Sequence, residues 1–271
     1  MNEPTDDSTL IAHQLQHFDA TAEAYFAARM NKNHQLYKKL LWSHFLKQLP
    51  LEHGKDIRVL EAMCGYADGR DIIQSHVGGP IDYIGFDYSA TVVDGLKKMS
   101  PDLNVFQQDV STYSPPKESF DITLIIGGLH HVPHLADQIV ANLVEGLKPG
   151  GIFLSFEPTH DNPLYKRIRQ RIYNKNVVFD EQSERAFSLS ELKSMFLDAG
   201  LKPQAILFPG LLAYILYYNP EAFPMLNLGG EWLVKSLFAL DSLIMGTSTG
   251  AKLSFATLSA WQKPFIPLGK P

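Results

Sequence analysis

The sequence predicts an α/β fold in which a parallel sheet has helices on both faces and carries an additional helical cap. Short apolar runs alternate with segments of helical periodicity over most of the chain, which is the pattern of parallel strands connected by helices. A stretch rich in Leu, Phe and Tyr, from residue 209 to about 245, follows the sixth candidate strand. We interpret that stretch as a helical insertion before the last strand.

Five apolar runs mark the first strands of the predicted sheet. They lie at Ile57–Ala62, Tyr83–Phe86, Val105–Phe106, Ile122–Ile126 and Ile152–Phe156. Leu201–Phe208 and Leu253–Trp261 are the candidates for the sixth and the last strand. Because helix-like segments separate most of these runs, the order of elements favours a parallel sheet over an antiparallel one.

Local signals mark the helices. Apolar residues at three- and four-residue spacing predict amphipathic helices over Leu10–Met30 and His34–Leu49. Ser188 to Glu191 has the Ser-x-x-Glu form of a capping box, and Gly200 would end the helix that begins there. We expect Lys148–Gly151 to stop a helix that starts near Leu135 and to turn the chain into the fifth strand, because proline cannot continue a helix.

Composition excludes several classes of function. The 271 residues include 24 Lys and Arg against 29 Asp and Glu, a net charge of −5, so no overall positive field would attract nucleic acid. The single cysteine, Cys64, cannot form an internal disulfide, and the acidic first ten residues differ from a secretion signal. We therefore expect a cytoplasmic protein. Charged residues or Pro and Gly interrupt the late apolar stretches Ile206–Tyr218 and Trp232–Met245, which argues against a transmembrane segment.

The strongest functional signal is the run Val59–Gly69, a strand that ends in a turn of small residues and opens a helix. Such a turn lets the backbone approach a ligand. Met63 and Ala67 stand where the additional glycines of a dinucleotide site would be useful, so a pyrophosphate is disfavoured. The acid at the strand end, Glu61, would also repel a pyrophosphate and would suit a cation.

Two further acids follow the next two strands. Asp87 lies 22 residues beyond Gly65, about the distance at which a second-strand acid accepts both hydroxyls of a ribose. Asp109 follows the third strand and could accept from an adenine amino group while Val110 packs on the ring. Ligands of open α/β sheets bind beyond the carboxyl ends of the strands, so the three acids should converge. The implied ligand has a ribose, an adenine and a positive charge.

At these residues the chain resembles the class I S-adenosylmethionine-dependent methyltransferases, in particular the branch that methylates small molecules. The family's motifs match Glu61–Ala67, Asp87, Asp109, Phe120–Val132 and Leu147–Gly151 in order. The resemblance implies a Rossmann-like sheet of seven strands whose last strand is antiparallel. It also implies S-adenosylmethionine as cofactor and S-adenosylhomocysteine as product. Glu61 would face the methionine amino group, and the other expected cofactor-binding residues are Cys64, Gly65, Asp87, Tyr88, Asp109, Val110 and Gly127.

The resemblance also suggests how the chain is organised. We expect an N-terminal helical lid at 1–50, with Tyr25 as a lid residue over the cofactor, and a core at 51–208. A helical cap at 209–247 and the final strand with its tail at 248–271 complete the chain. Tyr214, Tyr217, Phe223, Trp232 and Phe238 are available to line an apolar pocket in the cap, although they could also pack on one another.

Other residues have competing interpretations. His130 and His131 follow the fourth strand and are the candidates for a general base, but the same pair is common in the family, which suggests loop packing. We expect no metal site, because no further ligand lies at suitable spacing. Cys64 is more consistent with packing than with a nucleophile, and Asp121 with a structural role.

The sequence thus predicts methyl transfer to a small, apolar or amphipathic molecule, with O-methylation favoured and C-methylation next. Five cations between Tyr165 and Lys175 fit a solvated helix face, but they leave open an anionic substrate group or contact with a membrane surface. Two rival hypotheses remain: a non-methylating cyclase or isomerase that keeps the cofactor, and a regulatory module with a degenerate site. The oligomeric state is left open.

Overall fold

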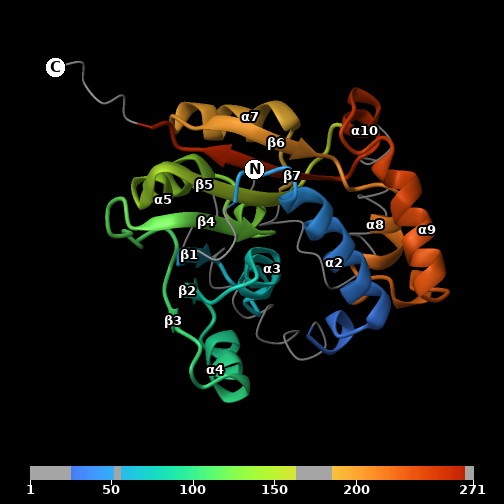
Figure 1. The fold of residues 1–271 in the computed structure, drawn as a ribbon, viewed down its shortest axis with the longest axis horizontal. Helices are drawn as coiled ribbons and strands as arrows, with labels where there is room; N and C mark the ends of the chain where they lie inside the picture. Colours follow the sequence, from blue (N-terminus) through green and yellow to red (C-terminus); the bar gives the residue numbers. More distant parts are fainter. Residues whose placement is uncertain (1–25, 52–55, 163–184, 266–271) are drawn as a thin grey trace, which may run out of the picture.

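The computed structural model describes residues 26–51, 56–162 and 185–265, which form one seven-stranded sheet (Figure 1). The strands are β1 Ile57–Ala62, β2 Ile81–Asp87, β3 Val105–Gln107, β4 Phe120–Ile126, β5 Leu147–Pro158, β6 Lys202–Leu207 and β7 Ala256–Gln262. Their order across the sheet is β3-β2-β1-β4-β5-β7-β6. β1 to β5 pair in parallel, and β7 is antiparallel to both neighbours. The predicted fold class is confirmed.

Helices cover both faces of this sheet. The helices between the strands are α3 Asp68–Val77, α4 Ala90–Met99, α5 Ala136–Glu145 and α7 Leu189–Asp198. Side chains of α3 and α4 belong to one core cluster, and those of α5 and α7 to another. Neighbouring strand residues alternate between the clusters, since Val59 belongs to the first and Leu60 to the second. The core is therefore two apolar layers separated by the sheet.

The N-terminal helix and the residues before β7 form an additional layer over one face. The elements are α2 Lys32–Leu46, α8 Leu212–Tyr217, η2 Pro224–Leu226, α9 Glu231–Ser242 and α10 Ser248–Leu253. α2 lies along α9 (Figure 1), where Tyr37 of α2 meets Phe238 of α9 edge to face at 6.1 Å between ring centroids. Both side chains are buried. The expected helical insertion is thus present, and it is joined to α2 by aromatic packing.

Two sequence predictions about boundaries are wrong. Pro149 and Gly150 do not form a turn before the fifth strand, because α5 already ends at Gly146 and β5 begins at Leu147. The pairing of β4 with β5 shifts register at this point, so the irregular residues lie inside the strand. Leu253 belongs to α10 rather than to the last strand, since the Thr247 side chain caps that helix by accepting from the Gly250 amide. Of the predicted helix at Leu10–Met30, only 26–30 lie among the described residues; 26–29 are helical and Met30 lies in a turn.

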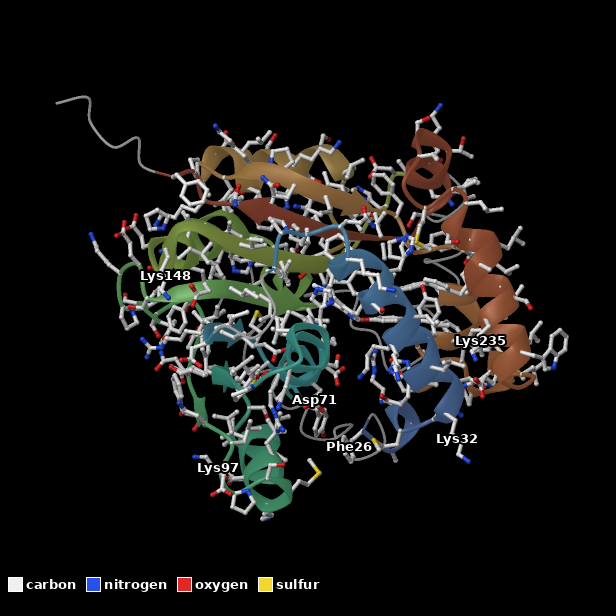
Figure 2. All side chains as sticks on the ribbon, viewed as in Figure 1. Phe26, Lys32, Asp71, Lys97, Lys148 and Lys235 are labelled. Atoms are coloured by element: carbon white, nitrogen blue, oxygen red, sulfur yellow. The ribbon has the colours of Figure 1, made fainter. Side chains whose placement is uncertain are left out.

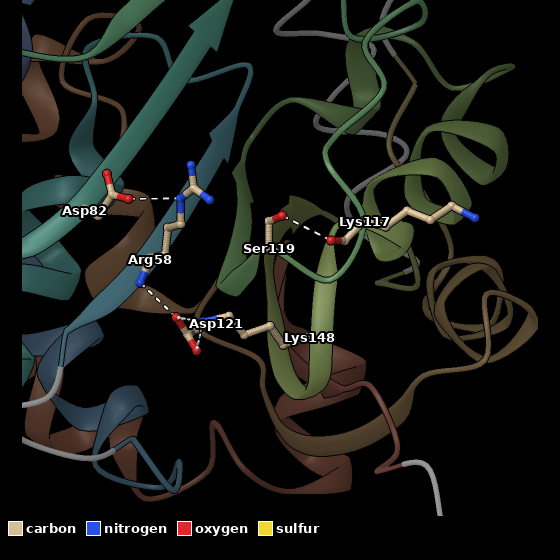
Figure 3. Close-up of polar contacts among 6 residues, drawn as sticks. All are labelled: Arg58, Asp82, Lys117, Ser119, Asp121 and Lys148. Carbon is tan, nitrogen blue, oxygen red and sulfur yellow. Dashed lines mark hydrogen bonds and ion pairs between the residues drawn. The ribbon is translucent and has the colours of Figure 1, made fainter.

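Asp121, at the start of β4, has a structural role (Figure 3). Its carboxylate accepts from the Arg58 amide of β1 at 2.9 Å and from Lys148 Nζ of β5 at 2.8 Å. The residue therefore joins three adjacent strands at their amino ends, at the edge of the sheet opposite to the predicted ligand crevice.

Among the described helices, none is long and apolar enough to cross a membrane.

The capping box of α7 gives a direct test of this fold. The Ser188 hydroxyl accepts from the Glu191 amide at 3.1 Å, and the Glu191 carboxylate accepts from the Ser188 amide at 2.7 Å. We expect Ser188→Ala to lower the free energy of unfolding by about 1 kcal/mol, measured by urea denaturation, because an N-terminal amide of the helix loses its partner. Ser194→Ala, an exposed position within the same helix, is the matched control and should be neutral or slightly stabilising. Equal effects of the two changes would contradict the capping role.

Candidate functional site

The candidate site lies where the sheet order reverses, between the carboxyl ends of β1 and β4. From β1 the chain builds outward to β2 and β3 and then returns to β4 on the other side of β1. Ligands of open α/β sheets bind at such a switch point. Two loops meet here, since a Cβ atom at Gly128 would lie only 2.8 Å from Met63 Sδ.

The loop after β1 has an unusual backbone. Met63, Gly65 and Ala67 have φ values of 54°, 49° and 59°, all in the left-handed region that favours glycine. Met63 and Ala67 thus adopt the glycine-like conformation without being glycine. A Cβ atom at Gly65 would meet no atom within 4 Å, so the backbone is open on that side. The loop therefore offers bare backbone to the crevice.

Asp87, the last residue of β2, holds this loop. Its Oδ2 accepts from the Gly65 amide at 2.9 Å, and its Oδ1 accepts from the Ser89 amide at 3.0 Å. Burial raises the pKa of the Asp87 carboxyl, while the two amides and the nearby His131 oppose that rise. Asp87 therefore connects the end of β2 to the loop after β1.

Glu61 has a different position from the one expected. Its side chain is 1% exposed and points into the sheet's α3 face, where Oε1 accepts from the Gly69 amide at 3.0 Å and Oε2 from the Tyr83 hydroxyl at 2.6 Å. Both oxygens are thus bonded within the protein. Glu61 thus fixes the start of α3. The expectation that its side chain faces a ligand amino group is corrected, because both oxygens are bonded within the protein and Glu61 can act on a ligand only by holding the loop.

Two glycines make this buried contact sterically feasible. A Cβ atom at Gly69 would lie 2.7 Å from Glu61 Oε1, and one at Gly85, the register partner of Glu61, would lie 2.6 Å from the Tyr83 hydroxyl. Burial raises the pKa of Glu61 to about 8, although the hydrogen bonds from Tyr83 and Gly69 act in the opposite direction. The acid therefore holds a proton over much of the neutral range.

The third acid and its neighbours complete the β2 and β3 side of the crevice. Asp109 lies two residues beyond β3, and its Oδ1 accepts from the Ser111 amide at 2.8 Å and the Ser111 hydroxyl at 2.7 Å. Val110 is buried, and Tyr88 is 39% exposed next to Asp87. The Asp109 carboxylate thus organises its own turn.

Gly127, His130 and His131 form the β4 side. Gly127 has φ 67° and donates its amide to the Phe156 carbonyl at 2.7 Å, while the short helix η1 Leu129–His131 follows at once. The two histidine rings face one another with centroids 4.0 Å apart. Cys64, in the opposite loop, is buried, and burial raises the pKa of its thiol well above the usual range, which fits packing rather than nucleophilic chemistry.

Sequence reasoning missed Glu157, which lies at the carboxyl end of β5. This buried carboxylate accepts from the amides of Gly128, Leu129 and His130 and contacts His130 Nδ1 at 2.9 Å. Its signal was present, because it is an acid at the end of an apolar strand, as Glu61 and Asp87 are.

The segment before α2 approaches the loop after β1. Phe26 packs on Tyr66 with ring centroids 4.7 Å apart, and Figure 2 shows it next to α3. Tyr25, the expected lid residue, lies outside the described residues, as does the cationic segment from Lys166 to Lys175. Phe26 thus connects the segment before α2 to the loop after β1.

The cap aromatics have mixed outcomes. Trp232 is 71% exposed on α9, so its expected place in a pocket is wrong. Tyr217 and Phe238 are buried in packing with α2 and the cap. Tyr214 is half-buried and stacks on Tyr218 at 4.7 Å, and both rings meet Phe156 at the end of β5. An aromatic cluster of Phe156, Tyr214 and Tyr218 therefore lies one residue from Glu157. Phe223 is also half-buried.

Comparison with known proteins relates this chain to methyltransferases. Residues 59–151 match the model of a methyltransferase domain. A probable S-adenosylmethionine-dependent methyltransferase of Mycolicibacterium smegmatis is 28% identical over 55% of this chain and 58% of its own length. Demethylmenaquinone methyltransferase of Staphylococcus haemolyticus is 26% identical over 54% of this chain and 60% of its own length. The chain thus spans less than two thirds of these relatives.

A solved structure shares the fold over nearly the whole chain. The 4+2 cyclase SpnF superimposes with a TM-score of 0.61 at 13% identity and covers 93% of this chain and 95% of its own. At that identity only the fold is shared. The domain match over residues 59–151 and the relatives support the predicted class I S-adenosylmethionine-dependent methyltransferase family and its cofactor class.

The left-handed conformation of Ala67 predicts an unusual mutational response. In Ala67→Gly, relief of about 1–2 kcal/mol of backbone strain offsets the loss of a buried methyl group, worth about 0.8 kcal/mol, and the added entropy of the unfolded chain. We expect the melting temperature to stay unchanged or rise. Ala239→Gly, in the exposed interior of α9, is the control and should cost about 1 kcal/mol. Equal destabilisation by both changes would contradict the strained loop.

The buried Glu61 predicts a pH dependence of stability. Its pKa is raised in the folded state, so between about pH 5 and 8 the folded protein binds more protons at this group than the unfolded chain does. The free energy of unfolding should therefore fall as pH rises through this range, by up to about 1.4 kcal/mol per pH unit. Glu61→Gln should flatten the curve, and Glu145→Gln, on the exposed end of α5, should not. Parallel curves for wild type and Glu61→Gln would refute the assignment.

Proposed function

We propose that the protein binds S-adenosylmethionine in the crevice between β1 and β4 and transfers its methyl group to a small apolar or amphipathic molecule. The observation that carries the proposal is the contact between Asp87 and the Gly65 amide, which joins a ribose-binding acid to a bare glycine turn. In this fold such a pair suits a nucleoside whose ribose lies over the strand ends. When bound, the cofactor supplies an electrophilic methyl group on a sulfonium.

The described residues fit this cofactor. Gly65 leaves open the space that a Cβ atom would fill, which accommodates the amino-acid end of the ligand close to the backbone. Asp87 would accept from the ribose hydroxyls, and Asp109 with Val110 would border the adenine. Tyr88, next to Asp87, is exposed enough to cover the ligand. Cys64 and Gly127 contribute backbone on either side of the crevice.

Glu61 would act on the cofactor through the protein rather than by direct contact. Its carboxyl holds the Gly69 amide and thereby the first turn of α3, and that turn continues the loop containing Gly65. Because this acid is protonated over much of the neutral range, it acts there through its hydrogen bond to the Gly69 amide rather than through a negative charge.

The substrate would lie between the strand ends and the cap. We assign residues 1–50 to a lid, 51–208 to the cofactor core, 209–247 to the cap and 248–271 to the last strand and tail. The aromatic cluster of Phe156, Tyr214 and Tyr218 supports an apolar substrate, as does the relative that is named for demethylmenaquinone. A hydroxyl nucleophile is favoured and a carbon nucleophile is next.

The carboxylate of Asp87 provides the direct test. Titration calorimetry with S-adenosylmethionine should give saturable binding by wild type and about a 100-fold loss in Asp87→Asn, because hydrogen bonds to a charged acceptor contribute about 1.5–3 kcal/mol each. Asp82→Asn, at the opposite end of the same strand and paired with Arg58, is the matched control and should bind as wild type does. Absence of binding by wild type, or equal binding by both variants, would overturn the proposal.

A second candidate is a cyclase or isomerase that keeps the cofactor unconsumed, and the fold shared with SpnF favours it among the rivals. The two functions differ in one product. If a substrate is turned over while S-adenosylhomocysteine accumulates in equal amount, methyl transfer is established, and turnover without S-adenosylhomocysteine supports the cyclase. The third hypothesis, a regulatory module, supposes a degenerate site; it loses support because Met63 and Ala67, although not glycine, adopt the left-handed conformation that glycine favours.

A further inference from the structure

Glu157 is a buried carboxylate placed at the ligand edge of the sheet. It is the last residue but one of β5, a central strand with β4 on one side and β7 on the other, and it is 1% exposed. A carboxylate of that burial is costly unless hydrogen bonds satisfy it. The hydrogen bonds that Glu157 makes therefore indicate its role.

Four nitrogen atoms converge on this carboxylate. Oε1 accepts from the amides of Gly128 at 3.0 Å and Leu129 at 2.9 Å, while Oε2 accepts from the His130 amide at 3.3 Å. The fourth contact joins Oε2 to His130 Nδ1 at 2.9 Å. The first three fix the backbone of η1 to the end of β5. The fourth does not hold backbone at all, but orients an imidazole ring.

The fourth contact selects a tautomer of His130. A carboxylate that accepts three amides offers only acceptor oxygens, so the proton in the contact with Oε2 belongs to Nδ1. A neutral imidazole carries one ring proton, and a proton on Nδ1 leaves Nε2 as the acceptor. The ring is also held from its other side by His131, whose centroid lies 4.0 Å away.

The ring lies at the crevice. His130 follows β4 by four residues, its Cε1 lies 3.9 Å from where a Cβ atom of Gly127 would be, and its side chain is 15% exposed. Its neighbour His131 is close enough to influence the charge of Asp87. The pair thus borders both the loop after β4 and the acid assigned to the ribose.

We propose that Glu157 is a positioning residue which holds His130 as a general base for a hydroxyl nucleophile, a role that rests on the proposed methyl transfer. The hydroxyl oxygen forms a bond to the methyl carbon as the bond between that carbon and the sulfonium sulfur breaks. The hydroxyl proton passes to His130 Nε2. The products are a methyl ether, neutral S-adenosylhomocysteine and an imidazolium that the Glu157 carboxylate stabilises, and the proton then leaves to solvent.

This arrangement favours substrates whose nucleophile is a hydroxyl group. A base with its acceptor nitrogen fixed is useful only if the nucleophile must lose a proton, since the sulfonium methyl group itself needs no activation. Phenolic and other hydroxyl groups meet that condition. The Glu157 carboxylate orients the His130 ring, and Nε2 of that ring accepts the hydroxyl proton, as in other sites where a carboxylate orients an imidazole base.

The tautomer can be measured without knowing the substrate. Nitrogen-15 NMR of histidine-labelled protein, with His130 and His131 assigned from His130→Gln and His131→Gln, should show the His130 proton on Nδ1 in wild type. In Glu157→Gln the amide group places a donor against the ring, so the proton should move to Nε2 and the ring should become protonated at a lower pH. Glu145→Gln is the control and should leave the His130 signals unchanged. A proton on Nε2 in wild type, or an unaltered His130 in a folded Glu157→Gln, would overturn the proposal.

A second measurement tests the location of the base. Saturation with S-adenosylmethionine, verified by calorimetry on the same sample, should shift the His130 ring nitrogens, while those of His44, which packs on Phe238 of α9, should not move. Verified binding without a shift at His130 would remove it from the reacting centre. Absence of binding would instead refute the proposed function, and the tautomer result distinguishes the two failures, because it does not depend on the ligand.

Discussion

The structure depends on the backbone of the loop between β1 and α3, where three residues within five have left-handed φ values. Each such conformation costs free energy in a residue with a side chain, so surrounding contacts must hold it. Glu61 does so from within the sheet, through the Gly69 amide, and Asp87 from the neighbouring strand, through the Gly65 amide. The two acids thus fix a strip of bare backbone at the switch point of the sheet.

The loop after β4 is organised by the same means. A buried acid at a strand end, Glu157, accepts the amides of the following turn, as Asp87 accepts that of Gly65. Carboxylates at strand ends therefore have two possible tasks in this fold, which are to hold a loop and to meet a ligand. Exposure separates them, since Glu61 and Glu157 are each 1% exposed, whereas Asp87 and Asp109 are partly exposed.

Most of the fold can be predicted because the spacing of apolar residues within each strand and helix is a local property of the sequence. The apolar run Ile57–Ala62 predicts β1 to the residue, and the Ser-x-x-Glu pattern predicts the capping box at Ser188. The errors arose where distant pairing overrides local preference. Pro149 and Gly150 signal a turn in isolation, but they lie in an irregularity within β5, between Leu147 and Ile152, which pair with β4, and Gly150 donates its amide to the Lys263 carbonyl. Leu253 looks like strand, yet Thr247 begins a helix that contains it.

The site was predictable only in part, for a related reason. Spacing along the chain placed Glu61, Asp87 and Asp109 at one edge, but it could not show that Glu61 points into the α3 face, since that depends on Tyr83 and on the two glycines that make room. Glu157 was missed because its partners are the amides of another loop. Likewise, burial by α2 decided which cap aromatics pack internally and left Trp232 outside.

The most direct test of this account is a crystal structure with S-adenosylhomocysteine. We predict that the ligand lies across Gly65, with both ribose hydroxyls within hydrogen-bond distance of the Asp87 carboxylate, its sulfur directed toward His130, and Glu61 still bonded to the Gly69 amide and the Tyr83 hydroxyl. Density for the ligand away from the β1 and β4 loops, or a Glu61 that turns out to contact it, would contradict the account.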